Sequence, residues 1–180
     1  ESRITPTVRS NGVLVAQVAP TGGRISGTSS IFKLDSWNWE DGVIVEDDGI
    51  HLNWPDANYR WYQDDKKQQK AAKAYQEQQD EIKAFFEKAK AYAKVDFHLE
   101  KDLRLEAMKN LFDGKAKLYV HADQVKEITD AFYFTDHYPD LQVVLVGAHD
   151  AWLVADHLKD RNVPVLLRRV HALPYYQDEA

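Results

Sequence analysis

Three strand-like runs alternate with helix-like stretches in the last third of this 180-residue chain. The runs are Lys117–Val120, Leu141–Val146 and Val163–Leu167. Each intervening stretch is long enough for one helix, and strand–helix–strand units of this length are parallel crossovers that are almost always right-handed. The alternation therefore predicts an α/β domain built from parallel βα units.

Composition and charge narrow the class of protein. The hydrophobic fraction is 44%, so residues 1–180 are expected to form a single globular domain with its own core. The net charge is −6 and no basic run is dense, so nucleic acid is not an expected partner. No apolar stretch approaches the roughly 20 residues of a membrane span. The absence of cysteine excludes thiolate chemistry, disulfides and cysteine-ligated zinc.

The first residues carry no targeting signal. The chain opens with Glu1-Ser2-Arg3 and not with methionine, so we expect a processed chain or an excised segment. Any targeting segment would then lie upstream of Glu1. The compartment, cytoplasmic or periplasmic, is left open by the sequence.

The N-terminal quarter predicts short strands joined by loops. Val13–Ala19 is apolar and β-branched, which predicts a buried strand. Thr21–Ser30 is rich in Gly, Ser and Thr and predicts a loop. Ile31–Asp35 and Val43–Glu46 are short strand candidates, and Asp47-Asp48-Gly49 predicts a turn.

An aromatic segment follows, and we expect residues 37–62 to be irregular. Two interpretations of its tryptophans are open: a stacking platform for sugars or bases, or anchors that hold the segment by burial. Burial is favoured because each indole removes a large area from water. The tryptophans are Trp37, Trp39, Trp54 and Trp61.

Two helices are predicted in the middle of the chain. Asp64–Lys94 lacks Gly and Pro, and its apolar residues recur at three- and four-residue spacing. This pattern predicts a long amphipathic helix packed on the domain edge, because the apolar stripe is too short for a coiled coil. Asp102–Phe112 predicts a second helix that Asp113-Gly114 ends.

A histidine follows each of the three strand-like runs: His121, His149 and His171. The carboxyl ends of parallel strands are where α/β proteins place their chemistry. A neutral imidazole is a good zinc ligand, and catalytic zinc usually takes three protein ligands. The three histidines either converge on one metal ion or are loop residues bonded to backbone. The remaining histidines are assigned to loops or helix surfaces and ranked lower: His51, His98, His137 and His157.

The segment Gly22–Ser29 has the outline of a phosphate-binding loop, because four residues separate Gly22 from Gly27. Thr28 stands where such a loop needs lysine, and the following residues predict a strand and not a helix. We therefore expect this loop to rim a site at the end of the first strand. Arg24 would then meet a substrate carboxylate.

Several segments resemble the imidazolonepropionase-related branch of the amidohydrolase superfamily: Gly22–Ser29, Asp35–Asp41, Asp102–Met108, Val120–Asp123 and Val163–Leu167. That family folds as a (β/α)₈ barrel beside a small β-sandwich and hydrolyses C–N bonds with metal-activated water. The resemblance implies a partial (β/α)₈ TIM-type barrel, spanning strands three to seven. Residues 36–94 would be an insertion with an aromatic-rich irregular part and a long helix.

The same resemblance assigns roles to the strand-end histidines. His121 matches the metal-binding histidine at the end of the fifth barrel strand. Many relatives carry a second metal-binding histidine where this chain has Gly147, and His149 two residues later would substitute for it. His171 would face a small-molecule substrate. The family's His-x-His pair would lie upstream of this chain and its catalytic aspartate downstream.

Two hypotheses of function follow. The first is a segment of a metal-dependent amidohydrolase that hydrolyses a C–N bond in a cyclic amide or a related small molecule. Its divalent ion would be zinc in the full-length protein, and the isolated segment would be inactive and hold no metal. The second is a non-catalytic binding or structural domain that keeps the barrel geometry. In either case the incomplete barrel leaves open sheet edges, which favours self-association.

Overall fold

The part of the protein that the structure describes forms one mixed six-stranded sheet whose strands follow the sequence order. The computed structural model describes residues 3–57, 64–95, 97 and 99–168. The first two strand pairs are antiparallel and the last three are parallel. The strands are β1 (Val15–Val18), β2 (Ile25–Lys33), β3 (Val43–Asn53), β4 (Lys117–Ala122), β5 (Gln142–Gly147) and β6 (Val165–Leu167).

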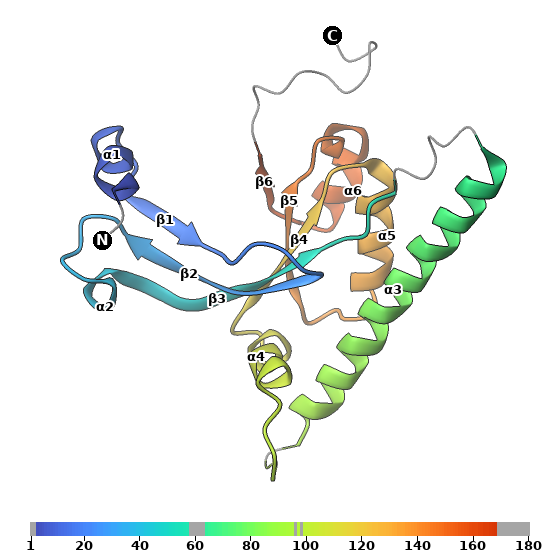
Figure 1. Cartoon of the computed structure of the whole chain (residues 1–180), viewed down its shortest axis with the longest axis horizontal. Helices are drawn as coiled ribbons and strands as arrows, with labels where there is room; N and C mark the ends of the chain where they lie inside the picture. The colour runs from blue at the N-terminus through green and yellow to red at the C-terminus, as the bar shows by residue number, and fades with distance from the viewer. Residues whose placement is uncertain (1–2, 58–63, 96, 98, 169–180) are drawn as a thin grey trace.

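The helices lie mainly beside the parallel strands. Figure 1 shows the antiparallel arm of β1, β2 and the first part of β3 extending away from α3, α5 and α6. The sheet curls as part of a (β/α)₈ barrel, which confirms the predicted fold class. The helices are α1 (Ile4–Ser10), α2 (Trp39–Gly42), α3 (Asp65–Ala93), α4 (Leu103–Phe112), α5 (Val125–Thr135), the short 3₁₀ helix η2 (Ala151–Val154) and α6 (Ala155–Asp160).

The long helix α3 confirms the prediction for Asp64–Lys94. Asp64 caps it by accepting hydrogen bonds from the backbone N–H groups of Lys66 and Lys67. Its apolar stripe packs on the core and against α4, so it is an edge helix and not a coiled-coil strand. Among the helices that the structure describes, none is both long and apolar enough to cross a membrane.

The core lies between the helices and one face of the sheet. Side chains alternate along a strand, so the apolar residues of β3 and β4 face the helices while their neighbours face the other side. Ile50 and Leu52 of β3 are buried in the core, as are Leu118 and Val120 of β4. Polar side chains occupy the alternate positions of these two strands: His51 and Asn53 of β3, and Lys117, Tyr119 and His121 of β4.

Three predictions for the N-terminal part are wrong. The run Val13–Ala19 does form a strand, β1, but its side chains are largely exposed and not buried. The predicted loop Thr21–Ser30 becomes strand from Ile25 onward. The predicted turn Asp47-Asp48-Gly49 lies inside β3, where Asp47 has a positive φ of 49° at an irregular point of the β2–β3 register. Long-range contacts of Asp48 with β1 and β4 keep this segment in the sheet.

The tryptophans divide between the two interpretations. Trp54 is buried, and its Nε1–H donates to the hydroxyl of Tyr75 at 3.2 Å. Trp37 and Trp39 are 95% and 69% exposed, so the prediction that they anchor the segment by burial is wrong. Trp61 lies outside the described residues.

Candidate functional site at the carboxyl ends of the parallel strands

A cavity of about 420 Å³ lies where β3 and β4 end and where the loops after β4 and β5 begin. It brings together side chains from four separate segments of the chain. Both predicted metal ligands, His121 and His149, line it. The charged residues of its wall are Asp56, Asp123, Glu127, Asp150 and Arg168.

His121 stands on β4 between Asn53 of β3 and Val146 of β5 in the register of the sheet. The guanidinium of Arg168 donates to its Nδ1 at 2.8 Å, and its Nε2 lies 2.8 Å from Nδ1 of His51. Burial, together with the nearby His51 and Arg168, lowers the pKa of His121 to about 4. The ring is therefore neutral at neutral pH.

His51 is the residue that the sequence interpretation undervalued. It lies on β3, is 5% exposed, and stacks on Tyr119 with ring centroids 4.7 Å apart and an interplanar angle of 7°. Burial lowers the pKa of His51. Its Nε2 is buried and has no hydrogen-bond partner in the part of the chain that the structure describes. We call Arg168, His121 and His51 the upper cluster.

His149 follows β5 in a loop that turns back toward α5. Its Nδ1 lies 3.0 Å from Oδ1 of Asp150, whose Oδ2 accepts a hydrogen bond from the backbone N–H of Val125. Asp150 thus ties the histidine loop to the first turn of α5. The structure places His149 at the same cavity as His121, while its role as a metal ligand stays a prediction.

Gly147 stands at the position where the resemblance expects a second metal-binding histidine. Its φ is 94°, in the left-handed region that favours glycine. A Cβ added there would collide with the carboxylate of Asp123. A side chain at this position would be strained and would force Asp123 to move, which explains the glycine in physical terms.

The structure does not test the predicted substrate contacts of Arg24 and His171. The guanidinium of Arg24 donates to the carbonyl oxygen of Asn53 at 2.9 Å and to Oε1 of Gln78 at 2.6 Å, joining β2, β3 and α3. Arg24 also lines a second cavity, of about 570 Å³, between β2, α3 and α4. Its contact with substrate stays a prediction, and His171 lies outside the described residues.

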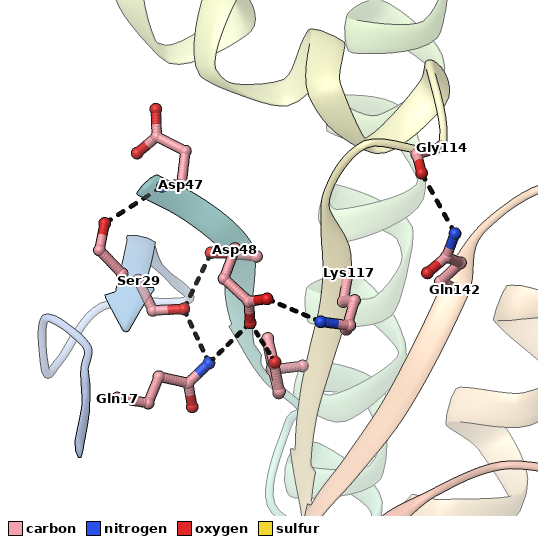
Figure 2. Close-up of polar contacts among 10 residues, drawn as sticks. Gln17, Ser29, Asp47, Asp48, Gly114, Lys117 and Gln142 are labelled. Atoms are coloured by element: carbon pink, nitrogen blue, oxygen red, sulfur yellow. Dashed lines mark hydrogen bonds and ion pairs between the residues drawn. The ribbon is translucent and has the colours of Figure 1, made fainter. Parts of the chain in front are cut away.

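A second polar group lies on the same face of the sheet, toward the start of β4. The buried carboxylate of Asp48 accepts hydrogen bonds from Lys117 Nζ at 2.6 Å, from Gln17 Nε2 at 3.1 Å and from the Tyr119 hydroxyl. Figure 2 shows Gln17, Ser29, Asp48 and Lys117 converging. We call Asp48, Lys117, Tyr119 and Gln17 the lower cluster.

The lower cluster compensates the charge that it buries. Burial alone would raise the pKa of the Asp48 carboxyl, but hydrogen bonds from Lys117 and Tyr119 outweigh it and hold the pKa below its usual value. Burial and the neighbouring carboxylate raise the pKa of Tyr119 to about 12. Asp48 is therefore ionised and Tyr119 neutral at neutral pH.

The described residues do not by themselves fit a metal ion. Within the described ranges, no group of three or more histidine, aspartate or glutamate side chains is arranged to hold one. Both ring nitrogens of His121 are engaged, by Arg168 and His51, and Nδ1 of His149 is engaged by Asp150. A metal site would need both a rearrangement here and ligands from elsewhere.

Comparison with known proteins bears on the fold. No protein-family model matches the chain, and no curated protein matches it either. The structure is similar to the crystal structure of an amidohydrolase from Thermotoga maritima MSB8, with a TM-score of 0.71 and 19% sequence identity. The match covers 93% of this chain and 45% of that one, so the chain spans less than half the length of its structural neighbour. The chain therefore has the fold of one part of an amidohydrolase.

Proposed function

We propose that this chain is the middle segment of a metal-dependent hydrolase that cleaves a C–N bond in a cyclic amide or a related small molecule. The observation that carries the proposal is the position of His121. It is a neutral imidazole at the carboxyl end of a parallel strand, it lines a cavity, and it sits in an amidohydrolase-like half-barrel. Active sites of barrel enzymes lie at this end of the strands.

The metal-binding and substrate-binding roles of the residues would be those that the sequence resemblance implies. His121 would contribute one ligand to a divalent ion, zinc in the first place, and His149 a second. Arg24 and His171 would contact the substrate. A bound ion of this kind activates water for hydrolysis. Because the described residues fit no metal by themselves, the segment in isolation would be inactive.

Activity of the complete protein tests the proposal. The complete protein containing this chain is purified and assayed for hydrolysis of a panel of cyclic amides, with His121→Ala and His157→Ala as matched variants. His157 lies on the exposed surface of α6. We expect hydrolysis in the wild type and in His157→Ala, and its loss in His121→Ala. Equal hydrolysis by all three proteins would contradict the proposal.

A second candidate function is a non-catalytic binding or structural domain that keeps the barrel geometry. The packing of Gly147 against Asp123 favours it, because this packing leaves no room for a second histidine at that strand end. The two functions differ in what the rest of the protein must contain. A His-x-His pair on an upstream strand and a strand-end aspartate downstream support the enzyme, and their absence from the complete protein supports the binding domain.

The edge strands of the sheet offer a surface through which two copies of the isolated segment could pair. Among the described strands, β1 and β6 lie at the edges of the sheet, and an unpaired edge is a template for pairing with another chain. We infer that the isolated segment self-associates through these edges. Light scattering coupled to gel filtration measures this directly. A monodisperse monomer whose edge-strand amides are all protected from hydrogen exchange would contradict the inference.

A further inference from the structure

The two ring nitrogens of His121 face groups of different hydrogen-bonding ability. An arginine guanidinium has only donors. Because Arg168 donates to Nδ1 of His121 at 2.8 Å, this nitrogen must be the acceptor and carries no proton. A neutral ring then has its proton on Nε2.

The proton on Nε2 of His121 determines the state of the next histidine. Nδ1 of His51 is 2.8 Å from Nε2 of His121, so it must accept that hydrogen bond. The proton of His51 therefore lies on its own Nε2, which is buried without a partner in the described part of the chain. The order of donors is thus Arg168 to His121 and His121 to His51.

The ring of His51 is also fixed by contacts with the lower cluster. Its ring stacks on Tyr119, and the hydroxyl of Tyr119 donates to the buried carboxylate of Asp48. Lys117 and Gln17 hold that carboxylate in turn. His51 is thus fixed by the core of the sheet. Arg168, in contrast, is exposed and can leave His121 without disturbing packed side chains.

We propose that Arg168 and His51 together hold His121 in the Nε2–H tautomer, so that Nδ1 is its unprotonated nitrogen. Arg168 donates to Nδ1, and His51 is a positioning residue that accepts from Nε2. This rests on the proposed function, because it names the atom through which His121 would act. It adds two residues, His51 and Arg168, to a site whose predicted metal ligands were His121 and His149. His51 acts through His121 and needs no contact with substrate.

The tautomer can be measured on the chain itself by NMR with ¹⁵N-labelled histidine, because long-range ¹H–¹⁵N spectra distinguish a protonated ring nitrogen from a bare one. We expect Nε2 of His121 to be protonated and Nδ1 to be bare. Finding the proton on Nδ1 would overturn the proposal. This first arm needs no variant, metal or substrate, so its failure is distinct from failure of the proposed function.

Two substitutions separate positioning from packing. His51→Phe keeps an aromatic ring on Tyr119 but removes the acceptor, whereas His51→Asn places an amide oxygen close to the position of Nδ1. Loss of one hydrogen bond should speed solvent exchange of the His121 Nε2 proton by about tenfold in His51→Phe. His51→Asn should restore slow exchange. Exchange that is equally slow in wild type and His51→Phe would overturn the role of His51.

Discussion

The upper and lower clusters share one face of one sheet and are linked by the stack of His51 on Tyr119, yet they differ in how completely they are satisfied. In the lower cluster, Asp48 accepts three side-chain hydrogen bonds, one of them from a lysine. In the upper cluster, two neutral histidines share one contact, and a buried nitrogen of His51 has no partner among the residues that the structure describes. Both are polar groups removed from water, and only one is fully compensated.

The difference separates a stabilising network from a candidate site. A compensated buried charge holds strands together, and in this protein it joins β1 and β3 to β4 at the end of the barrel where stability is the usual role. In the upper cluster, by contrast, His121 has a strongly lowered pKa and lines a cavity at the opposite end of the strands. Its neighbour His51 has a buried nitrogen that no other described residue compensates. Such a combination is typical of a functional site. The predictions below test whether the two clusters behave in these different ways.

The largest expected effect is the acid response of the upper cluster. The unfolded chain binds a proton on His121 near its ordinary pKa of 6.5, whereas the folded protein binds it only near 4. The free energy of unfolding should therefore fall as the pH drops through this window, by at most about 3 kcal/mol. Urea unfolding with a chelator, at a series of pH values from 7 to about 4, measures the loss.

Two variants test whether the loss of stability in acid comes from His121. His121→Asn should remove most of the slope, while His137→Asn, at an exposed position in the turn after α5, should keep it. The lower cluster should lose stability only at a lower pH. Because the pKa of Asp48 is held below its ordinary 3.8, its contribution is present above that pH and is lost only below it. If the free energy of unfolding fell over the same pH range in His121→Asn and in His137→Asn, the two clusters would not respond to acid separately.

Gly49 and Gly147 offer a steric comparison of the two ends. A Cβ at Gly49 would collide with the ring of Tyr119 and with the backbone oxygen of Lys117. Gly49→Ala should cost about 2–3 kcal/mol, since backbone cannot yield as a side chain can. The Cβ of Gly147→Ala would collide with the carboxylate of Asp123, a side chain that can move, and the residue would keep a positive φ. This substitution should cost about 1–2 kcal/mol. Thermal unfolding ranks the two, and a reversed order would contradict this account of the lower cluster.

Removal of the buried charge of Asp48 should have a smaller effect than Gly49→Ala. Asp48→Asn keeps the shape of the side chain but weakens the bonds from Lys117 and Tyr119, and should cost about 2 kcal/mol. The matched control is Asp47→Asn, one residue earlier and exposed, where asparagine tolerates the positive φ. Its effect should stay within about 0.5 kcal/mol. Equal urea midpoints for the two variants would show that the lower cluster adds nothing to stability.

Local patterns in the sequence were enough to predict the regular half of the fold. α3 follows from its apolar spacing and its lack of Gly and Pro, and α4 from the helical run that Asp113-Gly114 ends. The strands β4, β5 and β6 follow from short apolar runs separated by helical stretches. In each case the signal lies within a few residues of the element that it predicts.

The parts that were mispredicted depend on contacts between residues far apart in the chain. Asp47-Asp48-Gly49 has the composition of a turn, and it stays in β3 because Lys117 and Tyr119, about 70 residues later, bind Asp48. The sequence did not indicate the importance of His51, because its contact His121 lies 70 residues later in the chain. One usable signal was the alternation of Ile50 and Leu52 with His51 and Asn53, which is typical of a half-buried strand.

The central claim is that His121 belongs to a metal-dependent hydrolytic site, and the metal content of the complete protein tests it most directly. Wild type, His121→Ala and His157→Ala are purified identically, and bound zinc and other divalent metals are measured by mass spectrometry. We predict stoichiometric metal in the wild type and in His157→Ala, and its loss in His121→Ala. Metal content that is unchanged in His121→Ala, or an absence of metal from all three proteins, would contradict the account.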